Sequence, residues 1–182
     1  MIKFLKKLYD DFWKMINSYP RWRFIKPNVL FVFDYDNTLV EPVGTYERDF
    51  DLGKFEKDNT FLNNLKTKKL PLVKSCNNAY RRKDAYCVIM SSRANTWWFP
   101  LLLFIKGIKY DLLLLRHKGN TLDTASFKRN LMFKLLQDNL GQFTTKIFVD
   151  DVQENLDAIK TTFPEFVVIN AEKLGRKTDE TT

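Results

Sequence analysis

The sequence holds few of the residues that build disulfide frameworks, zinc sites and nucleotide-binding loops. Its 182 residues include two cysteines, one histidine and six glycines. Cys76 and Cys87 have neither the spacing of a zinc site nor a histidine base nearby in the sequence, so we expect two buried, unreactive thiols in a reducing compartment. A glycine-rich phosphate-binding loop is absent, and no kinase domain is therefore expected.

Long apolar runs are also missing. The longest apolar region, residues 97–105, is interrupted by Pro100 and followed by Lys106, and it is too short to cross a bilayer as a helix. The N-terminus lacks the continuous apolar segment and the small-residue cleavage site of a signal peptide. We therefore expect a cytoplasmic protein.

Aromatic residues and positive charge are both plentiful. Apolar residues make up 45% of the chain and aromatic residues 15%, which predicts one globular domain with a bulky core. The net charge of +8 fits a polyanionic partner such as nucleic acid or an acidic membrane surface, and it fits equally well a charge that keeps the protein soluble. The densest basic run, residues 66–83, has seven lysines and arginines and no acidic residue. Alone, such a run is more typical of a solvated face.

Residues 1–28 are predicted to form a basic amphipathic helix and a linker. Apolar residues recur at helical spacing over residues 2–18, with lysines between them, and Pro20 ends the pattern. We favour a helix that packs on the domain, because Asp10 and Asp11 weaken a membrane-binding face. The alternative is a weak contact with a membrane or a protein partner.

Five short apolar runs rich in branched and aromatic residues predict strands. These strands are expected over residues 29–33, 86–90, 111–115, 146–149 and 166–169. Helices are expected within residues 60–83, with a break near Pro71, and over 95–106, 124–139 and 153–162. Because strands alternate with helices, the predicted fold class is α/β, a three-layer Rossmann-like fold with a central five-stranded parallel sheet. The domain is expected over residues 29–172, with a polar tail over residues 173–182.

Polar residues follow three of the predicted strands at their carboxyl ends. These strand-end residues are Asp34, Asp36, Ser91, Ser92, Arg93, Asp150 and Asp151. In a parallel sheet all three ends meet at the edge where ligands bind. Lys128, on the helix after the third strand, can reach the same edge. One acidic strand end is often a turn or a helix cap, but several converging at one edge predict a functional site.

The residue types in this set favour phosphoryl chemistry. Carboxylates without histidine or cysteine suit a hard cation with oxygen ligands, and Mg²⁺ is the expected ion. Asp34 can attack phosphorus as a nucleophile, and Asp36 can protonate the leaving group and then activate water. Ser91 and Lys128 are suitable donors to phosphoryl oxygens. The acidic pair after the fourth strand would complete the metal site.

In order and spacing these motifs resemble those of the haloacid dehalogenase superfamily of aspartate-nucleophile phosphatases. Residues 34–39 are similar to its Asp-x-Asp-x-Thr signature, and residues 88–91 resemble its second motif. Lys128 stands at the place of the third-motif lysine, and residues 148–151 resemble the acidic fourth motif. The likeness extends over residues 29–170. It implies the fold of that superfamily with a minimal cap, because few residues separate the first two motifs.

The resemblance implies a role for each motif residue. Asp34 would be the nucleophile, and Asp36 the general acid and base with its backbone carbonyl on Mg²⁺. Thr38 would orient the loop. The residues expected to contact phosphate are Thr38, Ser91, Ser92, Arg93 and Lys128. Those expected at the metal are Asp34, Asp36, Asp150 and Asp151, and it stays open which of the last two touches the ion.

A narrower likeness is to the 3′-phosphatase part of phage-type polynucleotide kinases. That family pairs a Ser-Gly-Arg second motif with an Asp-Asp-Arg fourth motif, whereas this chain has Ser92 in place of the glycine and Val152 in place of the second arginine. Arg93 would then contact the phosphate or the nucleic-acid backbone. The other possibility is a surface cation at a strand end, and the sequence leaves both open.

The predicted function is a Mg²⁺-dependent phosphatase that works through an aspartyl-phosphate on Asp34. Because of the basic runs, a 3′-phosphate at a DNA or RNA end is the preferred substrate. A phosphatase of phosphoproteins or small phosphate esters uses the same chemistry and is an alternative. A non-catalytic binding protein with the same fold is another.

Overall fold

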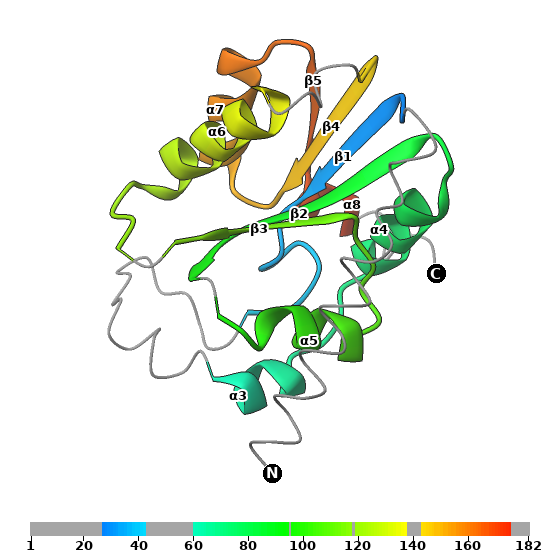
Figure 1. The fold of residues 1–182 in the computed structure, drawn as a ribbon, viewed down its shortest axis with the longest axis vertical. Helices are drawn as coiled ribbons and strands as arrows, with labels where there is room; N and C mark the ends of the chain where they lie inside the picture. The colour runs from blue at the N-terminus through cyan, green and yellow to red at the C-terminus, as the bar shows by residue number, and fades with distance from the viewer. Residues whose placement is uncertain (1–26, 43–59, 95, 118, 138–142, 176–182) are drawn as a thin grey trace.

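The architecture is a parallel sheet between two layers of helices (Figure 1). A computed structural model of the chain describes residues 27–42, 60–94, 96–117, 119–137 and 143–175. The strands are β1 (Val29–Phe33), β2 (Ala85–Ala94), β3 (Leu112–Arg116), β4 (Thr145–Asp150) and β5 (Phe166–Asn170). They pair in the order β3-β2-β1-β4-β5, and every pair is parallel. The predicted fold class is therefore confirmed.

The described helices cover both faces of the sheet. They are α3 (Phe61–Lys66), α4 (Leu72–Arg81), α5 (Phe99–Ile105), α6 (Thr124–Leu135), α7 (Gln153–Thr162) and α8 (Ala171–Gly175). Figure 1 shows α6 and α7 on one face, and α4 and α5 on the other. The described helices between β1 and β2 are α3 and α4.

The alternation of side chains along β1 builds two separate cores. Leu30 and Val32 point to the face covered by α6 and α7, where they pack with residues such as Met132. Phe33 points to the opposite face and packs with the apolar residues of α4 and α5. Since both faces of the strand are covered, a continuous apolar run is what a central parallel strand requires.

Several predicted boundaries were wrong by a few residues. β2 runs on to Ala94 rather than stopping at Met90. The helix expected from residue 95 begins at Phe99, with Pro100 in its first turn, where proline is best tolerated. Residues 171–175 form α8 where the polar tail was expected to begin, because Asn170 Oδ1 accepts hydrogen bonds from the backbone nitrogens at positions 172 and 173.

Some predictions concern residues that the structure does not describe, and two others can be compared with it directly. The predicted N-terminal helix over residues 2–18, and residues 43–59 of the loop after the first motif, lie outside the described residues. Within the part that is described, none of the helices has the length and apolar character that a membrane crossing requires. Cys76 and Cys87 are both buried thiols, as predicted, with their sulfur atoms 3.7 Å apart.

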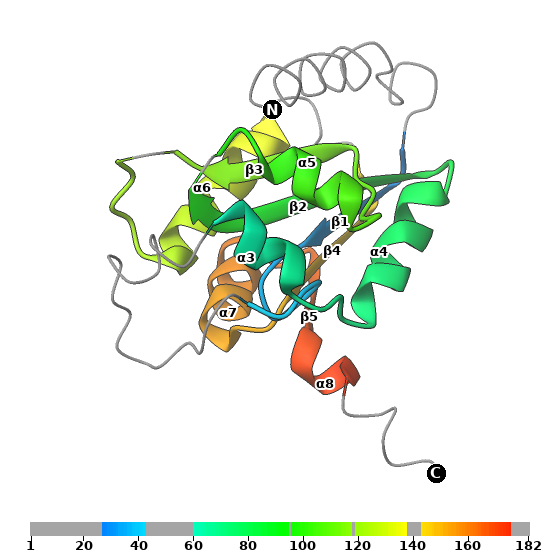
Figure 2. The same ribbon diagram turned by 90° about the horizontal axis from the view of Figure 1, so that it is seen from below.

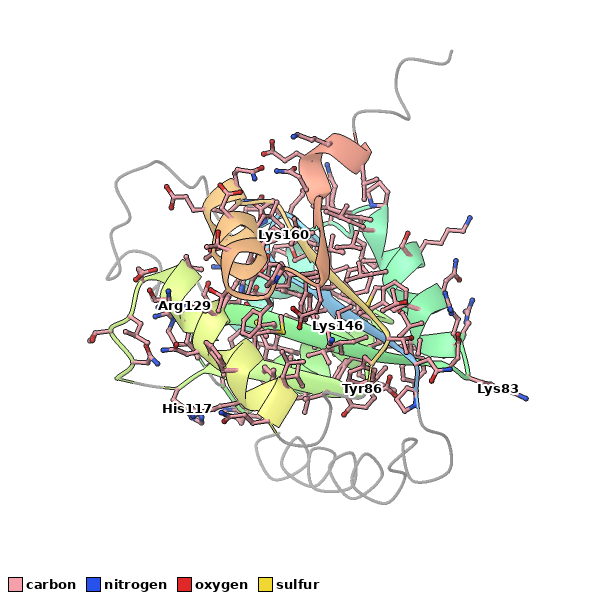
Figure 3. The ribbon with its side chains drawn as sticks, turned by 90° about the horizontal axis from the view of Figure 1, so that it is seen from above. Lys83, Tyr86, His117, Arg129, Lys146 and Lys160 are labelled. Atoms are coloured by element: carbon pink, nitrogen blue, oxygen red, sulfur yellow. The ribbon has the colours of Figure 1, made fainter. Side chains whose placement is uncertain are left out.

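The basic run over residues 66–83 does not form one patch. Its first part lies beside the loop after β1, because Glu41 N donates to Lys68 O at 2.9 Å and Lys69 bridges to Val40. Its last part, ending at Lys83, precedes β2 and so lies where the strands begin. Figure 3 shows Lys83 and His117, which follows β3, at opposite sides of the molecule. The two parts therefore lie at opposite ends of β1, a strand of five residues that spans roughly 15 Å.

Candidate active site

The loop after β1 turns back on itself and holds the first motif at the edge of the sheet. The nitrogens of Leu39 and Val40 both donate to Tyr35 O, at 2.9 and 3.1 Å. Asn37 has a φ of 52°, a left-handed conformation that asparagine tolerates better than most residues. Thr38 is fully buried, and within the described residues its hydroxyl has no hydrogen-bond partner. This turn keeps the motif at the carboxyl end of the central strand.

Lys128 joins two carboxylates from different strands. α6 begins after Asp123, whose carboxylate caps the helix by accepting a hydrogen bond from Ser126 N at 2.8 Å. Lys128 lies on the next turn, where its side chain is 2% exposed. Its Nζ is 2.6 Å from Asp34 Oδ1 and 2.6 Å from Asp150 Oδ2. Lys128, the lysine of the third predicted motif, therefore contacts Asp34 of the first motif and Asp150 of the fourth.

The carboxylate of Asp150 is held by donors on both of its oxygens. While Oδ2 faces Lys128, Oδ1 accepts hydrogen bonds from Val152 N at 3.0 Å and from Asn155 Nδ2 at 2.9 Å. Asp150 and Asn155 are both almost completely buried. Both oxygens of this buried side chain therefore have the hydrogen-bond partners that a buried polar group needs.

Asp34, Asp150 and Asp151 together form a group that fits a divalent cation. One carboxylate oxygen of each lies within 4.8 Å of one of each of the others. If all three are ionised, they carry three negative charges against the single positive charge of Lys128, which leaves two negative charges. A purely oxygen donor set with this excess charge suits Mg²⁺.

Without a cation, the local electrostatics favour the protonated forms of Asp34 and Asp151. Burial raises the pKa of Asp34 well above its usual value, and the neighbouring carboxylates add to the rise although Lys128 opposes it. Burial and Asp150 raise the pKa of Asp151 to about 6. Burial disfavours the charge on Lys128, but Asp34 and Asp150 raise the pKa of that ammonium group above its usual value. Lys128 is therefore charged at neutral pH.

We expect the stability of the metal-free protein to fall as the pH rises from 5 to 7. A carboxyl group whose pKa is raised by folding binds its proton more tightly in the folded state, so this contribution to the free energy of unfolding is lost as the pH passes the folded pKa. For Asp151 that pKa is about 6. Thermal unfolding with a chelator at both pH values measures the effect, and added Mg²⁺ should raise Tm more at pH 7 than at pH 5.

Asp151→Asn serves as the control for this prediction. The variant lacks the titrating group, so its Tm should change less between pH 5 and pH 7 than the Tm of the wild type. Parallel changes in the two proteins would show that Asp151 does not titrate in this range.

The second motif continues β2 into the site. Ser91 is buried, and its Oγ accepts a hydrogen bond from Arg93 N at 3.2 Å. The pairing of β2 with β3 changes register between Ser91 and Ala94, an irregularity of the kind often found beside active sites. Ser92 is half-buried, and its backbone oxygen accepts from Arg116 Nε at 3.1 Å. The backbone of Ser92 thus contacts the side chain of Arg116 on β3.

Arg93 is buried, with 1% of its side chain exposed, and pairs with Asp36. Its Nε lies 2.6 Å from Asp36 Oδ2, and a terminal nitrogen donates to the other carboxylate oxygen. The second terminal nitrogen donates to Asn64 Oδ1. The guanidinium also lies over the ring of Tyr35, with Cζ 5.2 Å from the ring centre. The possibility that Arg93 is a surface cation was wrong.

The structure thus brings most of the predicted site residues to one edge, in two groups. One group contains Asp34, Lys128, Asp150 and Asp151, and the other contains Asp36, Arg93 and the unpredicted Asn64. Asn155 was also missed, although an asparagine on the inner face of an amphipathic helix could have indicated a buried polar partner. Asn64 gave no comparable signal, because α3 is short and polar.

Known structures resemble this chain in fold. No profile of a known family and no curated protein matches the sequence. A chain of the Pnkp1/Rnl/Hen1 complex aligns over 79% of this chain with a TM-score of 0.55 and 18% identity. This chain spans 46% of that chain's length. A second structure, of the Pnkp1/Rnl/Hen1 RNA repair complex, aligns over 79% of this chain and 43% of its own, with a TM-score of 0.54 and 17% identity.

A further solved structure with a similar fold is that of a hydrolase. A HAD-superfamily hydrolase from Ehrlichia chaffeensis aligns over 80% of this chain and 88% of its own length, with a TM-score of 0.50 and 14% identity. At these identities the likeness concerns the fold, and function must be argued from the site. The fold of this chain is therefore similar to the fold of solved hydrolases of the haloacid dehalogenase (HAD) superfamily.

Proposed function

We propose that this protein is a metal-dependent phosphomonoesterase that works through an aspartyl-phosphate on Asp34. The observation that carries the proposal is the contact of one buried lysine, Lys128, with carboxylates from two strands, at 2.6 Å each. It holds Asp34 at the carboxyl end of the central strand. Asp36, two residues on, offers a second carboxylate at the same edge.

The proposed reaction has two half-reactions with opposite proton transfers. First, a carboxylate oxygen of Asp34 attacks phosphorus, the bond from phosphorus to the leaving oxygen breaks, and Asp36 gives that oxygen a proton. Second, a water oxygen attacks phosphorus of the aspartyl-phosphate, and Asp36 takes the water proton. The bond to Asp34 breaks, and inorganic phosphate leaves. Ser91 and Lys128 serve as donors to the phosphoryl oxygens.

The acidic cluster defines which residues would hold a cation. The carboxylates of Asp34, Asp150 and Asp151 would bind Mg²⁺, joined by the backbone carbonyl of Asp36 that the family resemblance implies. When bound, the cation offsets negative charge on the carboxylates and on the transferring phosphoryl group. The donors already on both oxygens of Asp150 favour Asp151 as the more available of the two ligands.

The preferred substrate is a phosphate at a nucleic-acid end. Lys68 and Lys69, in the part of the basic run beside the first motif, place positive charge on this side of the site. The side chain of Lys68 is 80% exposed, and its Nζ lies 3.9 Å from Glu41 Oε1. One solved structure with this fold belongs to an RNA repair complex. Cations at this place would attract the phosphate backbone next to the reacting end.

A panel of phosphorylated substrates with Mg²⁺ tests the proposal. It contains 3′- and 5′-phosphorylated oligonucleotides, nucleotides, sugar phosphates and a phosphopeptide. We expect the 3′-phosphorylated oligonucleotides to have the highest kcat/KM. Their kcat/KM should fall steeply with rising salt, because binding to the protein releases counterions from the nucleic acid and added salt opposes that release. Faster hydrolysis of sugar phosphates or phosphopeptides, with a flat salt profile, would contradict the nucleic-acid substrate and leave the phosphatase chemistry intact.

The two ends of the basic run offer matched variants for the same test. Lys68→Ala with Lys69→Ala removes two charges beside the site, and Arg81→Ala with Lys83→Ala removes two charges near the start of β2. We expect the first pair to raise KM for the oligonucleotide and to reduce the salt slope by about two. The second pair should leave both unchanged. Equal effects of the two pairs would show that net charge acts without a local contact.

A further inference from the structure

α3 reaches the site through Asn64. This side chain is fully buried, its Nδ2 donates to Thr60 O at 2.7 Å, and its Oδ1 accepts from Arg93. The two contacts require opposite ends of the amide, so together they fix its orientation. Figure 2 shows α3 beside α5, and the rings of Phe61 and Trp98 meet between them, with centroids 6.0 Å apart. The Asn64 side chain is therefore held by hydrogen bonds at both ends of its amide, on a helix that packs against α5.

We propose that Asn64 and Arg93 are positioning residues for Asp36, an inference that rests on the proposed function. Arg93 presents its planar guanidinium to both oxygens of the Asp36 carboxylate, which fixes the direction and the plane of that group. Asn64 fixes the guanidinium in turn. The charged form of Asp36 is the one left after its proton has passed to the leaving oxygen, and the one that takes a proton from water. The fixed guanidinium keeps this carboxylate in the same direction and plane for both proton transfers.

The surroundings of Arg93 distinguish this role from phosphate binding. Nε and one terminal nitrogen are engaged with Asp36, the other terminal nitrogen with Asn64, and aromatic rings of Tyr35 and Phe99 lie at 5.2 and 6.0 Å from Cζ. A guanidinium committed in this way contributes through the carboxylate it holds. Loss of Arg93 or Asn64 should therefore lower kcat for the proton-transfer steps and leave the affinity for phosphate unchanged.

The test combines Asn64→Ala with Asp36→Ala in a double-mutant cycle, with an alkyl phosphate as substrate. A displacement of about 1 Å in a catalytic group costs about a hundredfold in rate, so we expect Asn64→Ala to lower kcat/KM by about ten- to a hundredfold in the wild-type background. In the Asp36→Ala background the same change should have an effect of less than about twofold, because coupled residues do not act additively. The inhibition constant of inorganic phosphate should stay within about twofold of the wild-type value.

Matched variants separate positioning from folding. Leu62→Ala, at an exposed position of the same helix, should keep wild-type kcat/KM and Tm. Asn64→Asp keeps an acceptor for Arg93 and loses the donor to Thr60, so it should retain more activity than Asn64→Ala even if its Tm is lower. Arg93→Lys keeps the charge and loses the planar fork, so it should be as impaired as Asn64→Ala.

Each result bears on one proposal alone. Equal losses from Asn64→Ala in both backgrounds, a weaker inhibition by inorganic phosphate, or full activity of Arg93→Lys would overturn the positioning role. A wild-type protein that hydrolyses none of the phosphate esters would overturn the proposed function itself. The cycle is measured only after the wild type has been shown to turn over, so the two failures are distinguishable.

Discussion

Asp34→Asn is expected to abolish hydrolysis of every phosphate ester, including an activated aryl phosphate. The amide is not a nucleophile, and removal of the attacking group from a covalent mechanism costs at least about 10⁴-fold in kcat. An activated leaving group needs no proton, so it can compensate for the loss of a general acid. It cannot compensate for the loss of the nucleophile. The measurement is kcat with Mg²⁺ at saturating substrate, together with mass spectrometry of acid-quenched protein for a phosphoryl group on Asp34.

The fold of the Asp34→Asn variant should be retained, because its side-chain oxygen can still accept a hydrogen bond from Lys128. Asp157→Asn is the matched control, since it makes the same change at an exposed position of α7. It should keep full activity. If Asp34→Asn retains a tenth or more of the wild-type kcat, or if the phosphoryl group is found on another residue, the nucleophile has been assigned wrongly.

Lys128→Met is expected to destabilise the protein more than any other substitution considered. The substitution leaves Asp34 and Asp150 buried without the cation that both contact. Removal of one partner from a buried ion pair typically costs about 3–5 kcal/mol in the free energy of unfolding. Denaturant unfolding at pH 7 measures the loss. It should be smaller at pH 5, because the raised pKa of Asp34 lets that carboxyl group take up a proton.

Two controls accompany Lys128→Met. Lys134→Met, at an exposed position of α6, should change the free energy of unfolding by less than about 0.5 kcal/mol. Added Mg²⁺ should restore part of the stability of Lys128→Met, since a cation at the acidic cluster can replace some of the lost charge. Equal stabilities of the two variants would show that the lysine contacts are energetically unimportant.

The sheet and its motifs were predictable because they rest on local patterns. A run such as Val29–Phe33, apolar on both faces, can be satisfied in few places other than a covered parallel strand. Once the strands are parallel, the edge that gathers Asp34, Ser91 and Asp150 follows from their direction. The extension of β2 through Arg93 was missed because these residues are polar, and they are buried by the site rather than by the apolar core.

The contacts that bind the site together were not predictable. Asn64 is one of several asparagines on short polar stretches, and its function depends on Arg93, 29 positions further along the chain. The role of Arg93 stayed open for the same reason, because its partner is set by the path of the loop after β1. Pairings between distant polar side chains leave no periodic pattern in a single sequence.

The position of β1 at the centre of the sheet sets an order of assembly. β1 comes first among the described strands, but its two neighbours, β2 and β4, follow much later, and Thr144 Oγ1 bonds to Asn28 O across 116 positions. As the chain leaves the ribosome, Asp34 emerges long before Lys128 and Asp150. Contacts this distant in sequence form slowly. A nascent chain halted before β4 would expose one edge of its central strand, which makes this interval the most vulnerable to aggregation.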